Sequence, residues 1–110
     1  MAANITIPAG GRPTDVFGSR RVATPRYTGP NPYPNAGGTV GDPIAASDLG
    51  LRGITGFPGF IAFDPVGGAY RICVYDEVLE TIRWFVSTTG VEVANGVDLS
   101  AYSADIVVYG

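Results

Sequence analysis

Residues 70–87 read YRICVYDEVLETIRWFVS, in which two alternating runs of apolar residues flank a four-residue connection. Side chains on a β-strand alternate between its two faces, so runs of this kind are typical of strands. The pattern predicts a β-hairpin with strands at Tyr70–Asp76 and Thr81–Ser87, joined by a loop at residues 77–80. Both faces of each strand carry apolar side chains, and we therefore expect both faces to be covered.

The chain around this hairpin consists of short β-prone runs separated by turn residues such as Pro58-Gly59 and Asn95-Gly96. Short strands between glycine-containing turns predict an all-β fold, a small antiparallel β-sandwich or barrel. We expect its further strands at Leu51–Thr55, Phe60–Asp64, Val91–Ala94 and Ala104–Tyr109. The residues that we expect in its core are Ile61, Phe63, Ile72, Val74, Ile82, Trp84, Val86, Ile106 and Val108.

The N-terminal part of the chain has a different composition. Seven of the nine prolines lie at or before Pro43. Residues 1–41 have a net charge of +3, from four arginines and one aspartate, whereas residues 42–110 have −6, from three arginines and nine carboxylates. Because proline fixes φ and favours extended backbone, we predict a long extended Pro/Gly-rich N-terminal arm at residues 1–43 and a β domain at residues 44–110. A chain that lacks residues 1–40 is then expected to fold.

The basic residues of the arm are candidates for binding a partner. All seven basic residues of the chain are arginine, and a guanidinium group pairs with carboxylates through two hydrogen bonds and stacks on aromatic rings. An arm of this kind suits an acidic protein surface, although solvated charge in a loop is the alternative. The contact residues that we predict are Arg12, Arg20, Arg21, Arg26, Tyr27 and Tyr33.

The size and residue usage of the β domain favour assembly with other proteins. A domain of roughly 60–70 residues buries only about 60 % of its unfolded surface and is marginally stable. The chain has a single cysteine, Cys73, and no histidine, so neither an intrachain disulfide nor a Cys/His metal site is expected. We therefore expect oligomerisation or docking on a larger surface, no cofactor, and a packed, inert thiol at Cys73.

No residue pattern in the sequence predicts catalysis. Without histidine, the commonest general base is missing. Asp76, Glu77 and Glu80 cluster at the hairpin loop, where paired carboxylates could serve glycoside hydrolysis, but a solvated acidic loop is the simpler interpretation. We expect no enzymatic activity and no catalytic residues.

The sequence also bears on three kinds of partner, namely sugars, nucleic acid and membranes. Trp84 with Tyr70, Tyr75 and Phe85 could form a platform for stacking sugars, although aromatic residues at strand spacing are more often core. The acidic body would repel the phosphates of nucleic acid. Met1–Gly10 lacks the features of a signal peptide, and no apolar run approaches the ~20 residues of a membrane helix. We therefore expect neither a nucleic-acid partner nor a membrane.

Four stretches of the chain carry a resemblance to a known family: Ile5–Arg21 (ITIPAGGRPTDVFGSRR), Ala45–Leu51 (AASDLGL), Tyr70–Asp76 and Val93–Ser100 (VANGVDLS). They resemble small structural proteins of tailed bacteriophages, which are typically encoded beside the major capsid protein. Such proteins are head decoration, or cement, proteins that bridge capsomers, often as trimers. The resemblance carries no catalytic residues.

The resemblance implies a non-enzymatic virion structural protein on the outer surface of the capsid, assembled in the host cytoplasm. Its partner would be the major capsid protein, which the arm would clamp while the β body clusters with its own copies as a homo-oligomer, a trimer being favoured. Two alternatives stay open. One is a glycan- or receptor-binding module on a head fibre or tail, and the other is a head–tail junction protein.

Overall fold

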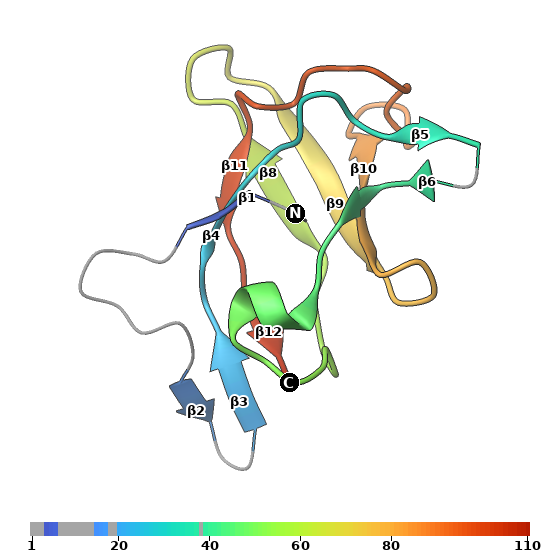
Figure 1. Cartoon of the computed structure of the whole chain (residues 1–110). Helices are drawn as coiled ribbons and strands as arrows, with labels where there is room; N and C mark the ends of the chain where they lie inside the picture. The colour runs from blue at the N-terminus through green and yellow to red at the C-terminus, as the bar shows by residue number, and fades with distance from the viewer. Residues whose placement is uncertain (1–3, 7–14, 18–19, 38) are drawn as a thin grey trace.

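The structure is a computed structural model, and it describes residues 4–6, 15–17, 20–37 and 39–110. Strands and one short 3-10 helix, η1, make up its regular structure (Figure 1). Their bounds are β1 Asn4–Thr6, β2 Asp15–Phe17, β3 Arg20–Ala23, β4 Arg26–Thr28, β5 Asn35–Ala36, β6 Thr39–Val40, β7 Asp42–Pro43, η1 Ala46–Leu49, β8 Phe60–Phe63, β9 Tyr70–Asp76, β10 Thr81–Val86, β11 Ser103–Asp105 and β12 Val108–Tyr109. The all-β prediction is confirmed.

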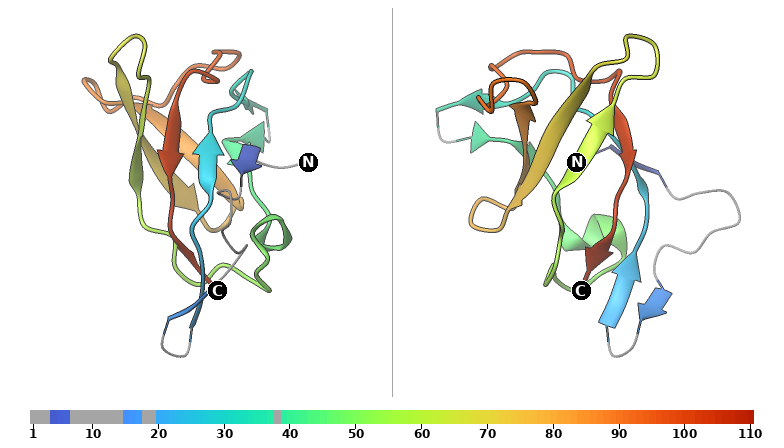
Figure 2. Two further views of the ribbon diagram at one scale, coloured as in Figure 1. Left: turned by 90° about the vertical axis from the view of Figure 1, so that its left-hand side faces the viewer. Right: turned by 180° about the vertical axis from the view of Figure 1, so that it is seen from behind.

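The largest sheet has seven strands in the order β1-β4-β11-β8-β9-β10-β7. Its described strand pairs are antiparallel, and the sheet curls around the interior of the molecule (Figure 2). A three-stranded sheet, β12-β3-β2, extends from one end, and β5 pairs with β6 in a short ribbon. The fold is therefore a curled antiparallel sheet, a half-barrel, with two smaller sheets beside it.

The predicted hairpin forms the centre of the large sheet. β9 has the predicted bounds, and β10 ends one residue earlier than predicted. Cys73 is paired with Trp84, and both are fully buried. Of the other predicted strands, Leu51–Thr55 is irregular chain, Val91–Ala94 contributes one isolated bridge through Glu92, and Ala104–Tyr109 is divided between β11 and β12.

The predicted core is right for β10 and β12 but wrong for β8 and β9. Ile82, Trp84, Ile106 and Val108 are buried, and Val86 is partly buried. The residues on the opposite face from the interior are Ile61, Phe63, Ile72 and Val74, which are 59 %, 47 %, 40 % and 44 % exposed. The inner, concave face instead carries the small side chains of Ala62 and Cys73, which leave room for the Trp84 ring on the neighbouring strand.

The N-terminal boundary at residue 43 also needs correction. Within the described residues, β4 lies between β1 and β11, and β3 is paired with β12. Pro25, Tyr27 and Tyr33 are among the largest fully buried side chains. Residues 20–37 and 39–43 thus belong to the β fold: Pro25 separates two strands rather than excluding the segment from the sheet. Residues 1–3, 7–14, 18–19 and 38 of the predicted arm lie outside the described residues.

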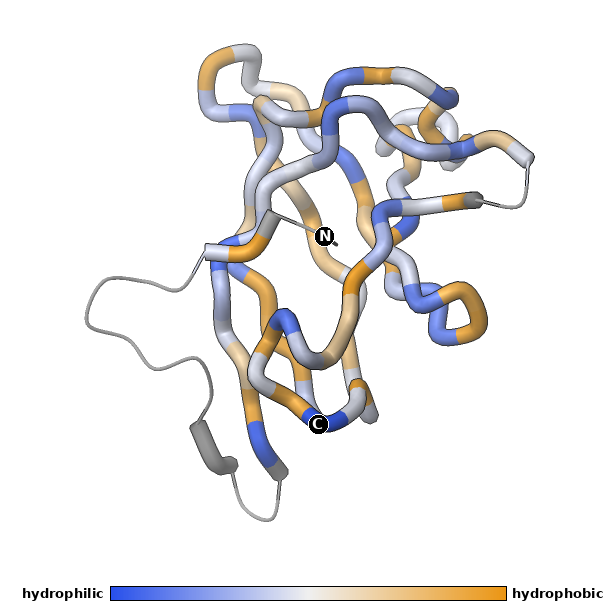
Figure 3. The backbone as a smooth tube through the Cα atoms, in the orientation of Figure 1, coloured by the Kyte–Doolittle hydropathy of each residue, from blue (hydrophilic) through white to orange (hydrophobic). Residues whose placement is uncertain are grey.

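The apolar residues that are not buried gather at loop tips as well as on the large sheet. Val66, in the β8–β9 connection, is 96 % exposed, and Val78, in the β9–β10 turn, is 86 % exposed. Figure 3 shows both loops as apolar tips that project from the body. Single exposed apolar residues of this kind are common on protein surfaces, so the contiguous set on the large sheet is the more informative feature.

Candidate protein-binding surface

The outward side of β8, β9 and β10 carries a continuous apolar surface, which we call the outer face. Pairing places Ile61 beside Ile72 and Ile72 beside Phe85, so one apolar row crosses all three strands. Neighbouring rows pair Phe63 with Tyr70 and Val74 with Arg83. In the right-hand view of Figure 2, no described strand crosses β8 and β9 on this side. The prediction that both faces of the hairpin are covered is not met by the described residues.

The charged side chains at the border of the outer face are paired. Arg83 donates hydrogen bonds to Glu92 Oε1 at 2.6 Å and to Asp76 Oδ2 at 3.4 Å, and its guanidinium lies 5.7 Å from the centre of the Phe85 ring. Burial alone would raise the pKa of Glu92, but hydrogen bonds from Arg83 and Tyr33 hold it below its usual value. The outer face is therefore apolar in its centre, and the charges of Arg83, Asp76 and Glu92 at this border are paired.

Two of the predicted contact residues, Tyr27 and Tyr33, lie inside the protein. The Tyr27 hydroxyl donates to Asp42 Oδ2 at 2.6 Å and accepts a hydrogen bond from Trp84 Nε1 at 3.1 Å. Tyr33 donates to Glu92 Oε2 at 2.7 Å and accepts from the Trp84 backbone N–H at 3.1 Å. Burial is the main cause that raises the pKa of both tyrosines. Because neither has exposed surface, their assignment as partner contacts is corrected to a structural role.

Of the predicted arginines, Arg21 and Arg26 have described side chains, and these two lie on different strands. Arg12 lies outside the described residues, and Arg20 begins β3. Arg21 and Arg26 are exposed on β3 and β4. Arg26 donates to Asp105 Oδ1 at 3.1 Å and to Ser103 Oγ at 2.9 Å. Exposed ion pairs of this kind contribute about 0–1 kcal/mol, so Arg26 can exchange its partner at little cost.

The aromatic platform predicted around Trp84 is not available to a sugar. Trp84 is fully buried, and its indole nitrogen is occupied by Tyr27. Tyr102 approaches it edge-on, with ring centres 5.9 Å apart. Tyr70 is exposed on the outer face, whereas Tyr75 is directed to the other side of β9. The four aromatic residues of the predicted platform therefore do not share one surface.

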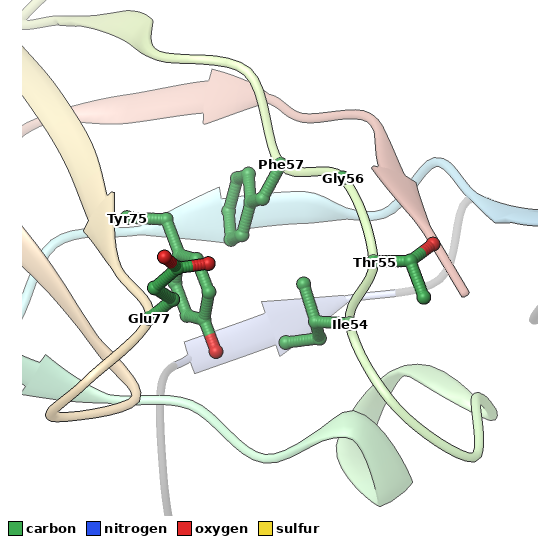
Figure 4. A pocket seen from close by; sticks show the side chains of 6 residues that line it. All are labelled: Ile54, Thr55, Gly56, Phe57, Tyr75 and Glu77. Atoms are coloured by element: carbon green, nitrogen blue, oxygen red, sulfur yellow. The ribbon is translucent and has the colours of Figure 1, made fainter.

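A cleft beside Tyr75 was not found by sequence reasoning. The cleft has a volume of about 240 Å³. The residues that line it are Ile54, Thr55, Gly56, Phe57, Tyr75 and Glu77. Figure 4 shows the side chains of Tyr75, in β9, and Glu77, just after β9, opposite Ile54 and Phe57 from the loop before β8. The Phe57 and Tyr75 rings stack with their centres 5.2 Å apart. Phe57 precedes a Pro-Gly turn, and its sequence position gives no sign of this long-range contact.

The carboxylates at the hairpin loop have two different environments. Asp76 accepts hydrogen bonds from the Leu79 and Val78 N–H groups and from Arg83, which lower its pKa. Asp76 therefore stabilises the turn. Glu77 lines the cleft, and Glu80 lines an adjoining hollow, so these two carboxylates face open space.

The described part of the protein is all-β, with one uncovered apolar sheet face. Comparison with known proteins does not narrow this class further. No family model, no curated protein and no solved structure matches the chain. Across the described ranges, no helix has the length and apolar character that crossing a bilayer requires.

Proposed function

We propose that this chain is a non-enzymatic virion structural protein that decorates and stabilises a bacteriophage capsid. The observation that carries the proposal is the outer face, an apolar surface of five exposed residues, Ile61, Phe63, Tyr70, Ile72 and Val74. Contiguous apolar surface on a small protein marks a place where another protein binds. The resemblance to tailed-phage structural proteins supplies the setting, in which the other proteins are further copies of this chain and the major capsid protein.

The outer face suits contact between copies of the chain. The chain has a net charge of −3, so contact between two copies is favoured at a surface where no unpaired carboxylate becomes buried. The outer face meets this condition, because Asp76 and Glu92 at its border are paired with Arg83. A stable interface buries roughly 800 Å² on each partner, so the apolar rows would form the centre of a contact whose rim includes neighbouring loops.

Attachment to the shell is assigned to the basic N-terminal sequence. Arg12, Arg20, Arg21 and Arg26 give residues 1–41 their net positive charge, and Arg21 and Arg26 are exposed. Guanidinium groups suit the carboxylates of an acidic surface on the major capsid protein. Many copies on one shell would add avidity to individually weak contacts. The proposed N-terminal clamp consists of arginines alone, because Tyr27 and Tyr33 are buried.

The test separates self-association from shell binding. Ile72→Asp is expected to convert an oligomer into a monomer in light scattering, whereas Val66→Asp, an equally apolar but isolated surface position, leaves the oligomer intact. In a Cys73→Ala background, Ile72→Cys is expected to form cross-linked dimers under mild oxidation and Val66→Cys is not. A wild-type protein that stays monomeric at high concentration, or an Ile72→Asp variant that associates as wild type does, contradicts the contact between copies.

Shell binding is measured by co-sedimentation with expanded capsids. The wild-type chain is expected to bind, and an Arg21→Ala/Arg26→Ala variant to bind more weakly, with an effect that diminishes at high salt. No sedimentation of the wild type with capsids contradicts decoration. The copy number in purified virions distinguishes a decoration protein, present over the whole shell, from a head–tail junction protein, present in one ring.

A further inference from the structure

A second hollow of about 360 Å³ adjoins the cleft beside Tyr75. Ile54, Tyr75 and Glu77 line both spaces, and Arg52 and Glu80 are among the residues that line only the second. Tyr75 and Glu77 therefore border both hollows. The second alone lies within the roughly 300–1,000 Å³ of small-ligand sites.

Tyr75 is the last ring of an aromatic stack. Phe57 stacks on Tyr75 with an interplanar angle of 23° and on Phe60 with an angle of 7°, the ring centres of the latter pair being 5.8 Å apart. Within the described part of the chain, Tyr75 has no further ring contact, and its hydroxyl makes no hydrogen bond. Tyr75 lines both hollows, so part of its ring borders open space, and the face of an aromatic ring attracts cations.

The charge of the cleft has the complementary sign. Neither Glu77 nor Glu80 forms an ion pair or a hydrogen bond through its carboxylate with any described residue, in contrast to Asp76. Burial is the main cause that raises the pKa of Tyr75, and the nearby negative charges of Glu80, Glu77 and Asp76 act in the same direction. Arg52 lines the second hollow but forms no ion pair with Glu77 or Glu80. The lining thus combines an aromatic ring with an excess of negative charge.

We propose that this cleft binds the cationic end of an arginine or lysine side chain presented by a partner polypeptide. The cation lies against the Tyr75 ring and between the carboxylates of Glu77 and Glu80. The aliphatic stem lies along Ile54, and Figure 4 shows Ile54, Tyr75 and Glu77 around the cleft. The Tyr75 ring and the two carboxylates each favour a positive charge. An anionic group would be repelled by both carboxylates, and a neutral apolar group would leave them without partners. This site is separate from the outer face and does not depend on the function proposed for it.

The experiment uses the full chain, labelled with nitrogen-15, and N-acetyl-arginine amide as the probe. Saturable changes in amide resonances are expected at residues 52–57 and 75–80, with weak affinity that decreases as salt is added. N-acetyl-citrulline amide, which has the same shape without the charge, is the matched control and is expected to produce no saturable change. Equal responses to both probes, or changes spread evenly over exposed carboxylates such as Asp98 and Asp105, overturn the proposal.

Substitutions locate the site. Glu77→Gln/Glu80→Gln is expected to abolish saturation, and Tyr75→Leu, which keeps an apolar side chain but removes the ring, to weaken binding about two- to fivefold. Asp105→Asn removes an exposed carboxylate elsewhere and is expected to leave the affinity unchanged. If Asp105→Asn weakens binding as much as the double glutamate variant does, the probe is responding to overall charge and the site is refuted.

The two proposals fail independently. Ile72→Asp is expected to bind N-acetyl-arginine amide as the wild type does, and Glu77→Gln/Glu80→Gln is expected to self-associate as the wild type does. A wild-type chain that stays monomeric but binds the probe contradicts only the function proposed for the outer face. A wild-type chain that self-associates but does not bind the probe contradicts only the cationic site.

Discussion

The Tyr27 hydroxyl accepts a hydrogen bond from the Trp84 indole at 3.1 Å in the interior of the protein. Their ring centres are 6.0 Å apart. Tyr27 belongs to the proline-rich beginning of the chain and Trp84 to the central hairpin, so this contact joins the two parts that the sequence distinguishes by composition. The same hydroxyl donates to Asp42, and the three side chains form one buried polar chain within an otherwise apolar core.

Tyr27→Phe removes the hydroxyl on which this polar chain depends. It leaves Asp42 without its donor and Trp84 Nε1 without its acceptor, and an unsatisfied buried polar group costs about 1–3 kcal/mol. The free energy of unfolding in urea is expected to fall by at least that amount. Tyr70→Phe is the control, because Tyr70 is 46 % exposed, and it is expected to have no measurable effect. Equal stability of the two variants would show that the buried chain contributes nothing.

Asp42 gives the stability a distinctive dependence on pH. Burial is the main cause that raises its pKa in the folded protein above the ordinary 3.8. A carboxyl group of this kind contributes stability that is fully present below the unfolded pKa and is lost as pH rises through the folded pKa. Relative to Asp42→Asn, the wild type is therefore expected to gain stability as pH falls from 7 toward 4. A difference that is constant over this range in urea unfolding would rule the effect out.

Glu92 is expected to act in the opposite direction. Its folded pKa lies below the ordinary 4.5, because the hydrogen bonds from Arg83 and Tyr33 outweigh the effect of burial. Its contribution is present above the unfolded pKa and is lost as pH falls through the folded pKa. Glu92→Gln should thus reduce the free energy of unfolding by ~1 kcal/mol at pH 7 and by progressively less toward pH 3. A cost that grows on acidification would contradict this assignment.

Gly29 tests whether the early part of the chain is built into the fold. A methyl group added there would meet the Leu99 carbonyl oxygen and would lie 2.9 Å from Trp84 Cη2. Gly29→Ala is therefore expected to destabilise the protein by about 1–3 kcal/mol through overpacking. Gly53→Ala is the matched control, because a Cβ there meets no atom within 4 Å. Thermal unfolding that treats the two variants alike would mean that Gly29 lies away from Trp84.

Cys73 is expected to be unreactive in the native protein. It is fully buried, and burial raises the pKa of its thiol well above the ordinary value. A thiol reagent such as Ellman's reagent should modify it only as fast as the protein unfolds, and the rate should increase with added urea. Complete modification within the mixing time in buffer would show that this part of the sheet opens freely.

The central hairpin could be predicted because its information is local. Alternation in Tyr70–Asp76 and Thr81–Ser87 and the short loop between them determine two paired strands. Which side of β9 faces inward could not be predicted, because Ile72 and Val74 on one side are as apolar as Cys73 on the other. The choice depends on the space beside Trp84, and that space exists only after the sheet has curved.

The role of residues 20–43 could not be predicted for a related physical reason. Proline density predicts extended chain, but proline only restricts φ and removes a donor. Tyr27, two positions after Pro25, can still occupy an interior strand because both neighbouring strands pair with it. Those neighbours are β1 and β11, and no local pattern connects segments so far apart.

The cleft illustrates the same limit for the site. Tyr75 and Glu77 are two residues apart and so share a side of the chain near the end of β9. Their proximity to each other could therefore be anticipated. Phe57 and Ile54 lie in an irregular loop, and only the three-dimensional path of that loop brings them opposite Tyr75.

The pairing of β3 with β12 has a consequence for biosynthesis. Val22 and Ala23 are partnered by Tyr109 and Val108, and Arg21 exchanges backbone hydrogen bonds with Gly110. A nascent chain on the ribosome makes β3 long before it makes the strand that β3 needs. Such distant pairings close slowly, and unpaired strand edges attract other chains in the meantime. Native closure therefore waits until translation has passed β12, and a ribosome stalled before that point would hold an aggregation-prone intermediate.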